Sequence, residues 1–168
     1  MSDYRSNNPP RNPNVRATVQ SSVQRRTPPD SETHAPNRDE LTRTAGQLIF
    51  VPLNAELFNS VARQAAEVIA ENRNANKPSQ IRKFYDELCM WETKVGLEPE
   101  RFKDYLPFIL MLNAKLAYAK GRRLVDDKFV KLIGDCLKQV KDPETLRICK
   151  LFFEAFLGFY KELRPSDK

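Results

Sequence analysis

The sequence predicts an all-α protein, a compact bundle of five to six helices preceded by a disordered N-terminal tail. After about residue 50, apolar residues recur at helical spacing almost without interruption, and no alternating pattern of useful length indicates a strand. Before residue 46, prolines and polar residues dominate, and Tyr4 is the single aromatic residue. These two observations divide the chain into an Arg- and Pro-rich tail and a helical domain.

Residues 1–45 are predicted to be disordered because they bury too little apolar surface to offset the entropy of ordering. They contain no apolar stretch like that of a signal peptide or a membrane span, and their acidic residues are atypical of a mitochondrial transit peptide. The folded domain is predicted at 46–168, which is long enough to build a core. The chain has a net charge of +6, most of it in this domain, so an anionic partner is permitted but not required.

The first two helices are predicted at 54–72 and 79–95, with a polar loop between them. Asn54 and Ser79 are suitable N-caps for these helices, and apolar residues at three- and four-residue spacing follow each cap. Gly96 suits the C′ position after the second helix.

A short helix at 99–105 is expected to begin at Pro99. Pro107 is expected to open a separate helix, 107–120, because a proline inside a continuous helix costs about 3 kcal/mol. Gly121 is expected to close that helix. Its apolar residues lie on nearly every side, which predicts a position at the centre of the core.

The last two helices are predicted at 126–140 and 143–163. Asp126 is the expected cap of the first, and Asp142 followed by a proline gives the second an N-cap and a proline at N1. The last helix carries apolar residues on more than one stripe, so it is expected either to be central or to contact another chain. The short connections indicate antiparallel neighbours.

The residue types that most enzyme chemistry requires are missing from the predicted domain. Its glycines are isolated and form no phosphate-binding loop, and the chain's one histidine, His34, lies in the tail. The adjacent acids at 126 and 127 are better explained as a helix cap than as metal ligands. The sequence therefore indicates a protein without catalytic activity, cofactor or bound metal. Three cysteines without metal-binding spacing are interpreted as reduced, packed thiols: Cys89, Cys136 and Cys149.

Basic residues on two of the predicted helices are the remaining candidates for function. Arg82 and Lys83 lie on a polar face, where each can form an i,i+4 ion pair, with Asp86 and Glu87 respectively. Lys115 is unusual because helical spacing places it among apolar residues. Its side chain can extend along its neighbours to water, pair with an acid on another helix, or contact a phosphate.

A second group of cations, Lys120, Arg122 and Arg123, follows at the end of the same helix. Cations interact favourably with the dipole at a helix C-terminus, but two arginines beyond the glycine exceed what that effect needs. Helical spacing also brings Tyr118 and Arg122 to the side of the helix that carries Lys115. This side is therefore a candidate for binding an anionic partner.

Three segments resemble the motif regions of the small subunit of type III-A CRISPR effector complexes, the Csm small subunit. They are PSQIRKFYDEL at 78–88, LPFILMLNAKLAYAKGR at 106–122 and FFEAFLGFYK at 152–161. The order and spacing of the three blocks agree with the family over about residues 48–163, and the central block is the most specific. The tail lies outside this resemblance.

The resemblance implies a non-catalytic, cytoplasmic protein of antiviral defence that stacks head to tail along the duplex of CRISPR RNA and target RNA. Its implied partners are both RNAs, other copies of itself, and the large and backbone subunits of the complex, with no cofactor, metal or membrane. The residues expected to contact RNA phosphates are Arg82, Lys83, Lys115 and Arg122, with Lys120 and Arg123 as outer contributors.

A helical adaptor that binds only protein is the alternative from a different class, because ion pairs within the chain also account for the basic residues. The small subunit of type III-B complexes is a close sibling that sequence physics does not separate. The copy number in the complex, the oligomeric state of the free protein, the guide or target identity and the role of the tail are left open.

Overall fold

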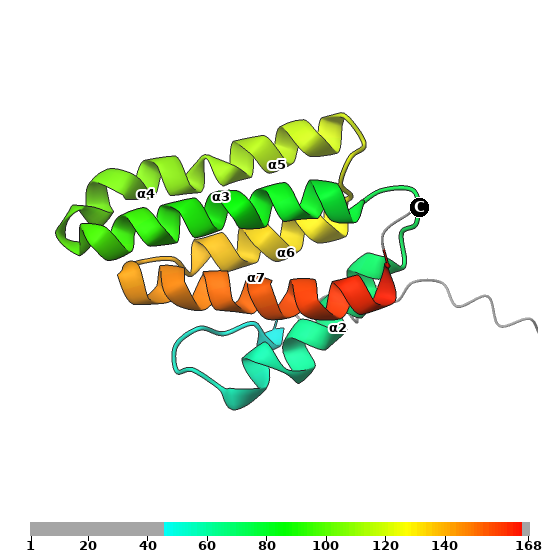
Figure 1. Ribbon diagram of the computed structural model, residues 1–168, viewed down its shortest axis with the longest axis horizontal. Helices are drawn as coiled ribbons and strands as arrows, with labels where there is room; N and C mark the ends of the chain where they lie inside the picture. Colours follow the sequence, from blue (N-terminus) through cyan, green and yellow to red (C-terminus); the bar gives the residue numbers. More distant parts are fainter. Residues whose placement is uncertain (1–45, 166–168) are drawn as a thin grey trace, which may run out of the picture. The chain divides into compact units, whose positions relative to one another are not determined.

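The computed structural model of the protein describes residues 46–165, and the predicted disordered tail, 1–45, lies outside them. Within 46–165 the chain forms helices and no strand, which confirms the predicted all-α class (Figure 1). Two of the elements are 3₁₀-helices, labelled η. In chain order the elements are η1 (Ala55–Phe58), α2 (Ser60–Ala70), α3 (Pro78–Leu97), η2 (Pro99–Arg101), α4 (Phe102–Leu110), α5 (Leu112–Gly121), α6 (Asp127–Lys138) and α7 (Pro143–Leu163).

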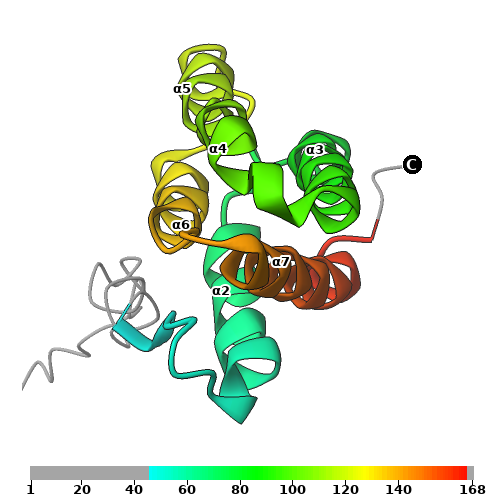
Figure 2. The same cartoon turned by 90° about the vertical axis from the view of Figure 1, so that its left-hand side faces the viewer.

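Helix α7 occupies the middle of the helical bundle, packed against α2 and α3 (Figures 1 and 2). Its rings form a stack in which the centroids of Phe153 and Phe156 are 5.5 Å apart and those of Phe156 and Tyr160 are 5.4 Å apart. The ring of Phe129, from α6, contacts both phenylalanines at 6.1 and 6.4 Å. Of the two expectations for the last helix, the structure shows the central position.

Helix α5 lies at the outer edge of the bundle, where α4 and α5 run antiparallel to α3 (Figures 1 and 2). One stripe of α5 is buried, and it packs against α6. Met111, just before this helix, and Tyr118 on it are exposed. The prediction that this helix forms the centre of the core is therefore wrong. Because α5 packs on one side only, some of the apolar residues that surround it remain exposed to water.

Helix α4 runs through Pro107, which contradicts the expected helix start at that residue. Only Met111 separates α4 from α5, and its backbone N–H donates to the carbonyls of Pro107 and Phe108, both at 3.2 Å. A proline within a helix removes the hydrogen bond to the carbonyl four residues earlier, here that of Lys103. Both Lys103 and Pro107 are exposed, so water can replace the lost bond.

Helix α3 also departs from its expected ends, because prolines set both of them. It begins at Pro78, one residue before the expected cap Ser79. It continues through Gly96 and ends at Leu97, because the next residue, Glu98, has a φ of −136° and a ψ of 64°, outside the α region. Pro99 follows, and a proline disfavours the α conformation in the residue before it.

The end of α5 is a Schellman motif centred on Arg123 rather than on Gly121. The N–H of Arg123 donates to the carbonyl of Lys120 at 2.8 Å, and that of Leu124 to Ala119 at 3.0 Å. Arg123 has a φ of 58°, the left-handed conformation that glycine usually supplies at C′. Helix α5 thus ends at Gly121, within one residue of the predicted end, but the C′ position falls on Arg123, two residues later than expected.

The caps of α6 and α7 agree with the sequence prediction. The Asp126 carboxylate accepts a hydrogen bond from the N–H of Phe129 at 2.9 Å. The Asp142 carboxylate accepts from the N–H of Thr145 at 2.7 Å, and the Thr145 hydroxyl accepts from the N–H of Asp142 at 3.0 Å, which completes a capping box. The hydrogen bond from the backbone of Thr145 lowers the pKa of Asp142 below its usual range.

We expect Asp142→Ala to lower the free energy of unfolding at neutral pH by about 1 kcal/mol, the usual cost of losing such a cap. Asp142→Asn keeps an acceptor at the cap and is the matched control. Because the folded-state pKa is depressed, the stability that the ionised carboxylate contributes is present above the unfolded-state pKa and is lost as pH falls through the folded-state pKa. In urea unfolding at decreasing pH, the free energy of unfolding of the wild type should therefore approach that of Asp142→Asn. A difference between the two free energies that stays constant with pH would contradict this account.

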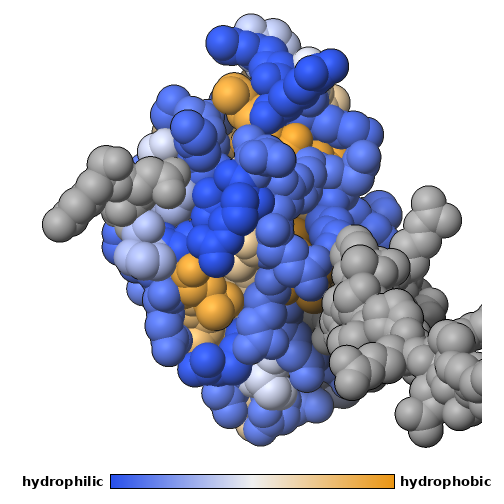
Figure 3. All heavy atoms as spheres, turned by 90° about the vertical axis from the view of Figure 1, so that its right-hand side faces the viewer, coloured by the Kyte–Doolittle hydropathy of each residue, from blue (hydrophilic) through white to orange (hydrophobic). Residues whose placement is uncertain are grey.

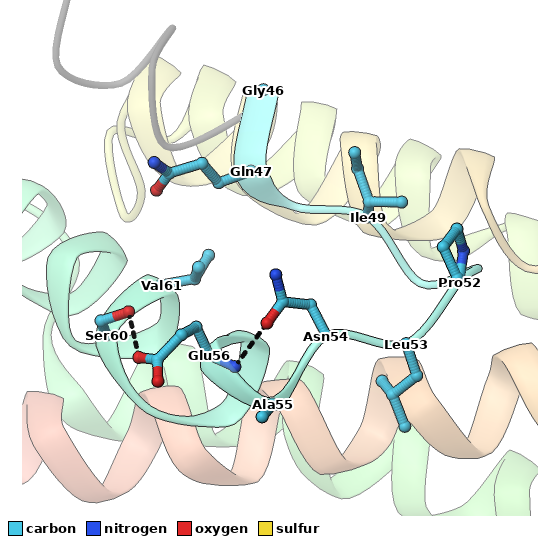
Figure 4. Close-up of a pocket in the computed structure, with 10 residues that line it drawn as sticks. All are labelled: Gly46, Gln47, Ile49, Pro52, Leu53, Asn54, Ala55, Glu56, Ser60 and Val61. Carbon is cyan, nitrogen blue, oxygen red and sulfur yellow. Dashed lines mark hydrogen bonds between the residues drawn. The ribbon is translucent and has the colours of Figure 1, made fainter.

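The predicted first helix, 54–72, is divided at Asn59, whose φ of −116° and ψ of −98° interrupt it between η1 and α2. Its N-cap is the predicted one. The Asn54 side chain accepts from the N–H of Glu56 at 2.9 Å, and the Glu56 carboxylate in turn accepts from the hydroxyl of Ser60 at 2.6 Å (Figure 4).

Residues 46–53 form a strap that precedes η1. Leu48 and Phe50 are buried in the core. Gln139 follows α6, and its side chain binds the backbone of the strap. The side-chain nitrogen of Gln139 donates to the carbonyl of Leu48 at 2.7 Å, and its side-chain oxygen accepts from the N–H of Phe50 at 2.9 Å. The intervening Ile49 lines a hollow of about 740 Å³ between the strap and the start of α2 (Figure 4).

The loop between α2 and α3 is held by the guanidinium of Arg164, which follows α7 and is 3% exposed. This group donates to the backbone carbonyls of Asn72 at 2.8 Å, Ala75 at 3.0 Å and Arg73 at 3.3 Å. It therefore gives a donor to three carbonyls of the loop that follows the C-terminus of α2.

Buried Asn76 joins the same loop to two further elements. Its carbonyl accepts from the hydroxyl of Tyr160 at 2.5 Å, and its side-chain oxygen accepts from the N–H of Asp126 at 3.0 Å. These bonds and those of Arg164 fix the start of α3 relative to the end of α7 and the start of α6.

The cysteines agree with their interpretation as packed thiols. Cys136 and Cys149 are buried, Cys89 is half-buried, and all three are free. Burial raises the pKa of the Cys136 thiol well above its usual range, and the neighbouring Cys149 adds to this effect.

Candidate nucleic-acid interface

The predicted RNA-binding residues lie on two antiparallel segments and on the turn that follows one of them. The start of α3 and the end of α5 lie at the same end of the bundle (Figure 1). Viewed from that end, the surface is mainly hydrophilic with smaller apolar areas (Figure 3). The six residues divide into two on α3 (Arg82, Lys83), two on α5 (Lys115, Lys120) and two in the turn after α5 (Arg122, Arg123).

Lys115 forms an ion pair with an acid on another helix. Its ammonium group donates to both carboxylate oxygens of Glu87, on α3, at 2.6 and 2.7 Å. The Lys115 side chain is 51% exposed and that of Glu87 is 20% exposed. Lys115 is therefore a surface residue that links α5 to α3, and its ammonium group remains open to water on one side.

One side of α4 and α5 carries residues at alternating three- and four-residue spacing, and all of them are exposed: Phe108, Met111, Lys115, Tyr118 and Arg122. Tyr118 lies between the two cations in the sequence, and the guanidinium carbon of Arg122 is 5.6 Å from the centroid of its ring. The structure thus brings Lys115, Tyr118 and Arg122 together on one surface, as their spacing predicted.

Arg82 lies on the α7 side of α3, away from this surface. Its guanidinium bonds to Asp86 at 2.7 Å, the predicted i,i+4 pair, and lies 5.3 Å from the ring centroid of Tyr85. The hydrogen bond and the charge of Asp86 raise the pKa of Arg82. Arg82 also lines a hollow of about 410 Å³ together with residues from the start of α3 and the end of α7.

Lys83 lies one turn before Glu87 on α3, so helical periodicity puts it on the side that faces α5. Its expected partner Glu87 bonds to Lys115 instead. No ion pair of Lys83 is present within residues 46–165. Lys83 is therefore an available cation on α3, one turn away from the Lys115–Glu87 pair.

The two outer cations differ in their surroundings. Lys120 pairs with Asp127 at the start of α6, and both side chains are exposed. Arg123 is exposed and occupies the C′ position of the Schellman motif. In the described part of the chain, Arg82, Lys115 and Lys120 thus have acidic partners, while Arg122 contacts a ring.

Comparison with protein families matches residues 53–166 to the family described as Csm2 Type III-A, which is well over half of the chain. The chain belongs to the Csm2 type III-A family. The resemblance seen in the sequence is thereby confirmed. The curated proteins and the solved structures contain no match to the chain.

Membership of the Csm2 family makes the chain a structural small subunit of a type III-A CRISPR complex, which associates with other Csm subunits and RNA. The family match begins at residue 53, so most of the strap lies before it. Across residues 46–165 no helix has the length and apolar character needed to cross a bilayer. The same residues contain no group of three His, Cys, Asp or Glu side chains placed to hold a metal ion.

Sequence reasoning about this Csm2 chain missed two features of the candidate interface. The first is Glu87, which was assigned to Lys83 on its own helix but bonds to Lys115. No local signal predicts that contact, because it depends on how α5 lies along α3. The second is Tyr118, which the sequence places on the candidate side of the helix without a role of its own. Its position between two cations was visible in the sequence.

Proposed function

We propose that several copies of this chain stack head to tail along the duplex of CRISPR RNA and target RNA and contact its phosphates. The contacting residues are two cations on the α3 side, Arg82 and Lys83, two on α5, Lys115 and Lys120, and two in the following turn, Arg122 and Arg123. In this role the chain has no catalytic activity, needs no cofactor or metal, and works in the cytoplasm in antiviral defence, beside the large and backbone subunits.

The side of α5 that carries Lys115 and Arg122 is the observation that supports this proposal. Both cations are exposed, and they lie two turns apart on one helix side, with Lys83 across from them on α3. Such a row of cations suits a backbone that carries a phosphate at every nucleotide. It gives no means of reading base edges, so these contacts position the RNA while base pairing supplies the specificity.

A single subunit with a few phosphate contacts should bind RNA weakly, and stacked copies should bind it much more tightly. Each phosphate contact that is lost should reduce the log–log salt slope by about 0.7–0.9. Arg82 lies on a different side of α3 from the other cations, so its contact would be to a separate part of the RNA or to the RNA of a neighbouring copy.

The division of the chain is part of the proposal: residues 46–168 act as the small-subunit domain, and residues 1–45 are an Arg- and Pro-rich tail outside it.

The alternative function, a helical adaptor that binds only protein, is favoured by one observation. Arg82, Lys115 and Lys120 already have acidic partners within the chain. In that reading the cations stabilise the fold and do not meet RNA.

The double variant Lys115→Glu with Arg122→Glu separates the two functions. We expect it to keep normal helicity and to weaken retention of RNA in the reconstituted complex, because two phosphate contacts become repulsive. Retention is measured from the RNA that co-purifies with the tagged complex, and helicity from far-UV circular dichroism.

The matched control is Lys138→Glu with Arg147→Glu, which makes the same change in net charge on exposed residues of α6 and α7. This control should retain RNA as the wild type does. RNA retention that is normal in the Lys115/Arg122 variant, together with normal assembly, would exclude the RNA-binding role and favour the adaptor.

The Lys115–Glu87 pair should limit RNA binding, because Glu87 competes with phosphate for the same ammonium group. We expect Glu87→Gln to strengthen RNA binding about two- to fivefold, which corresponds to the usual strength of an exposed ion pair. Titration of the complex with RNA at two or more salt concentrations measures the effect. Glu144→Gln also removes one carboxylate from an ion pair, that with Arg147 on α7, although Glu144 is more exposed than Glu87, and it is the control. Equal affinities for the two variants would show that Glu87 does not restrain Lys115.

A further inference from the structure

The exposure of Tyr118 is not explained by phosphate binding. The residue is 67% exposed, and in the described chain its one ring contact is with Arg122. Phe108, two and a half to three turns earlier on the same side, is also exposed, but its ring stacks on Trp91 at a centroid distance of 6.0 Å and an interplanar angle of 17°. Phe108 therefore has a packing partner, whereas one face of the Tyr118 ring is left to solvent.

Tyr118 has a cation on either side of it. Lys115 lies three residues before it and Arg122 four residues after it, so their Cβ atoms are roughly 5–6 Å from that of Tyr118. A nucleotide within a strand presents the same pattern, a flat base flanked by one phosphate on its 5′ side and one on its 3′ side. Aromatic rings interleaved with cations are how proteins bind unpaired nucleotides, with the base stacked on the ring.

We propose that Tyr118 is a stacking platform for an unpaired nucleotide of the bound RNA, with Lys115 and Arg122 neutralising the phosphates on its two sides. This proposal rests on the proposed function, because it requires that this side of α5 meets RNA. It adds a preference for RNA with an unpaired nucleotide over fully paired RNA, which phosphate contacts alone do not supply. A base within a continuous duplex is covered by its neighbours, so only a base displaced from the stack has a free face to offer Tyr118.

Besides contacting a phosphate, Arg122 orients the ring of Tyr118 in this arrangement. Its guanidinium lies over the Tyr118 ring, which restricts the ring's orientation and covers one face. The remaining face is then the one on which a base stacks. The Tyr118 hydroxyl is not needed for this contact, because stacking depends on the ring alone.

The test uses the full-length protein and two RNA duplexes of the same sequence, one fully paired and one with a single unpaired 2-aminopurine nucleotide in the middle. Affinity is measured by fluorescence anisotropy over a range of salt concentrations, and stacking by quenching of the 2-aminopurine. The variants are Tyr118→Leu, Tyr118→Phe and Arg122→Gln, and circular dichroism checks that each is folded. The tail is present in every variant, so differences between variants do not come from it.

The wild type should bind the RNA with the unpaired nucleotide more tightly and quench its fluorescence. Tyr118→Leu should weaken binding to that RNA about tenfold, which is the range expected for one base–aromatic contact, abolish the quenching, and leave the paired duplex and the salt slope unchanged. Tyr118→Phe should behave as the wild type. Arg122→Gln should weaken both RNAs and reduce the salt slope by about 0.7–0.9.

Two outcomes overturn the proposal. If Tyr118→Leu affects both RNAs equally, or neither, while Arg122→Gln weakens both, the surface binds RNA but Tyr118 is not a platform for an unpaired base. If Arg122→Gln leaves both RNAs bound as tightly as the wild type does, the RNA contact at this surface fails and the stacking proposal fails with it.

Discussion

Replacing Arg164 by alanine is expected to lower the free energy of unfolding by about 3 kcal/mol, because one buried and two part-buried carbonyl groups lose their donor at once. The Arg164 guanidinium donates to the carbonyls of Asn72, Arg73 and Ala75, which lie in the loop that connects α2 to α3. Alanine supplies no donor, and each buried carbonyl left without a partner costs about 1–3 kcal/mol before water or backbone movement compensates.

Urea and thermal unfolding measure this effect, and a loss of this size should lower the Tm by roughly 10 °C for a domain of this length. Arg147→Ala is the matched control, because Arg147 lies on α7, the helix that Arg164 follows, with its guanidinium in water, 3.8 Å from Glu144. That control should change stability by less than about 0.5 kcal/mol. A loss below about 1 kcal/mol for Arg164→Ala would mean that the loop carbonyls find other donors.

Phe129→Ala is expected to cost about 3–5 kcal/mol, the usual range for removing a buried phenylalanine ring. Phe129 is fully buried, and its ring centroid lies 5.7 Å from that of Phe84 and 6.1 and 6.4 Å from those of Phe153 and Phe156. Its removal leaves a cavity between α3, α6 and α7. These helices cannot close this space without moving the ring stack of α7.

Urea unfolding of Phe129→Ala should show a lower midpoint and an unchanged m-value, which indicates lost stability in an otherwise intact two-state fold. Phe129→Leu, which keeps much of the volume, should lose considerably less. Phe108→Ala is the control for a ring at the surface, since Phe108 is about half exposed. A similar loss at positions 108 and 129 would contradict the placement of Phe129 at the centre of the core.

The sequence predicted best those features that depend on neighbouring residues. Asp126 and Asp142 cap their helices as expected, because a cap bonds to a backbone N–H only three residues away. The all-α class followed from the spacing of apolar residues, and the spacing also placed Lys115, Tyr118 and Arg122 on one side of α5.

The wrong predictions concern residues whose conformation depends on their exposure or on a stronger neighbouring signal. Pro107 is accommodated inside α4 because that side of the helix faces water. Gly96 remains helical because Pro99 ends α3 instead. Gly121 remains helical as well, and the left-handed position falls on Arg123. In none of these cases does the residue type alone determine where the helix ends.

The candidate interface shows the same limit at the tertiary level. The sequence identified the individual cations, but it could not assign the partner of Lys115, because Glu87 reaches it from a different helix. Neighbouring positions on α3 also turned out to face different helices, since Arg82 lies toward α7 while Lys83 is on the α5 side. To predict that two adjacent residues face different helices, one must know which helix packs on each side of α3.

The bonds of Gln139 to the strap involve only backbone atoms of Leu48 and Phe50, and this affects how the sequence can change during evolution. Any residue except proline at position 50 offers the same N–H, and any residue at 48 the same carbonyl, so these bonds impose no side-chain identity on the strap. The constraint falls on position 139 instead, 89 residues away from Phe50. A glutamate there could accept from one group but could not donate to the other, so the amide should persist among relatives even where the strap sequence drifts.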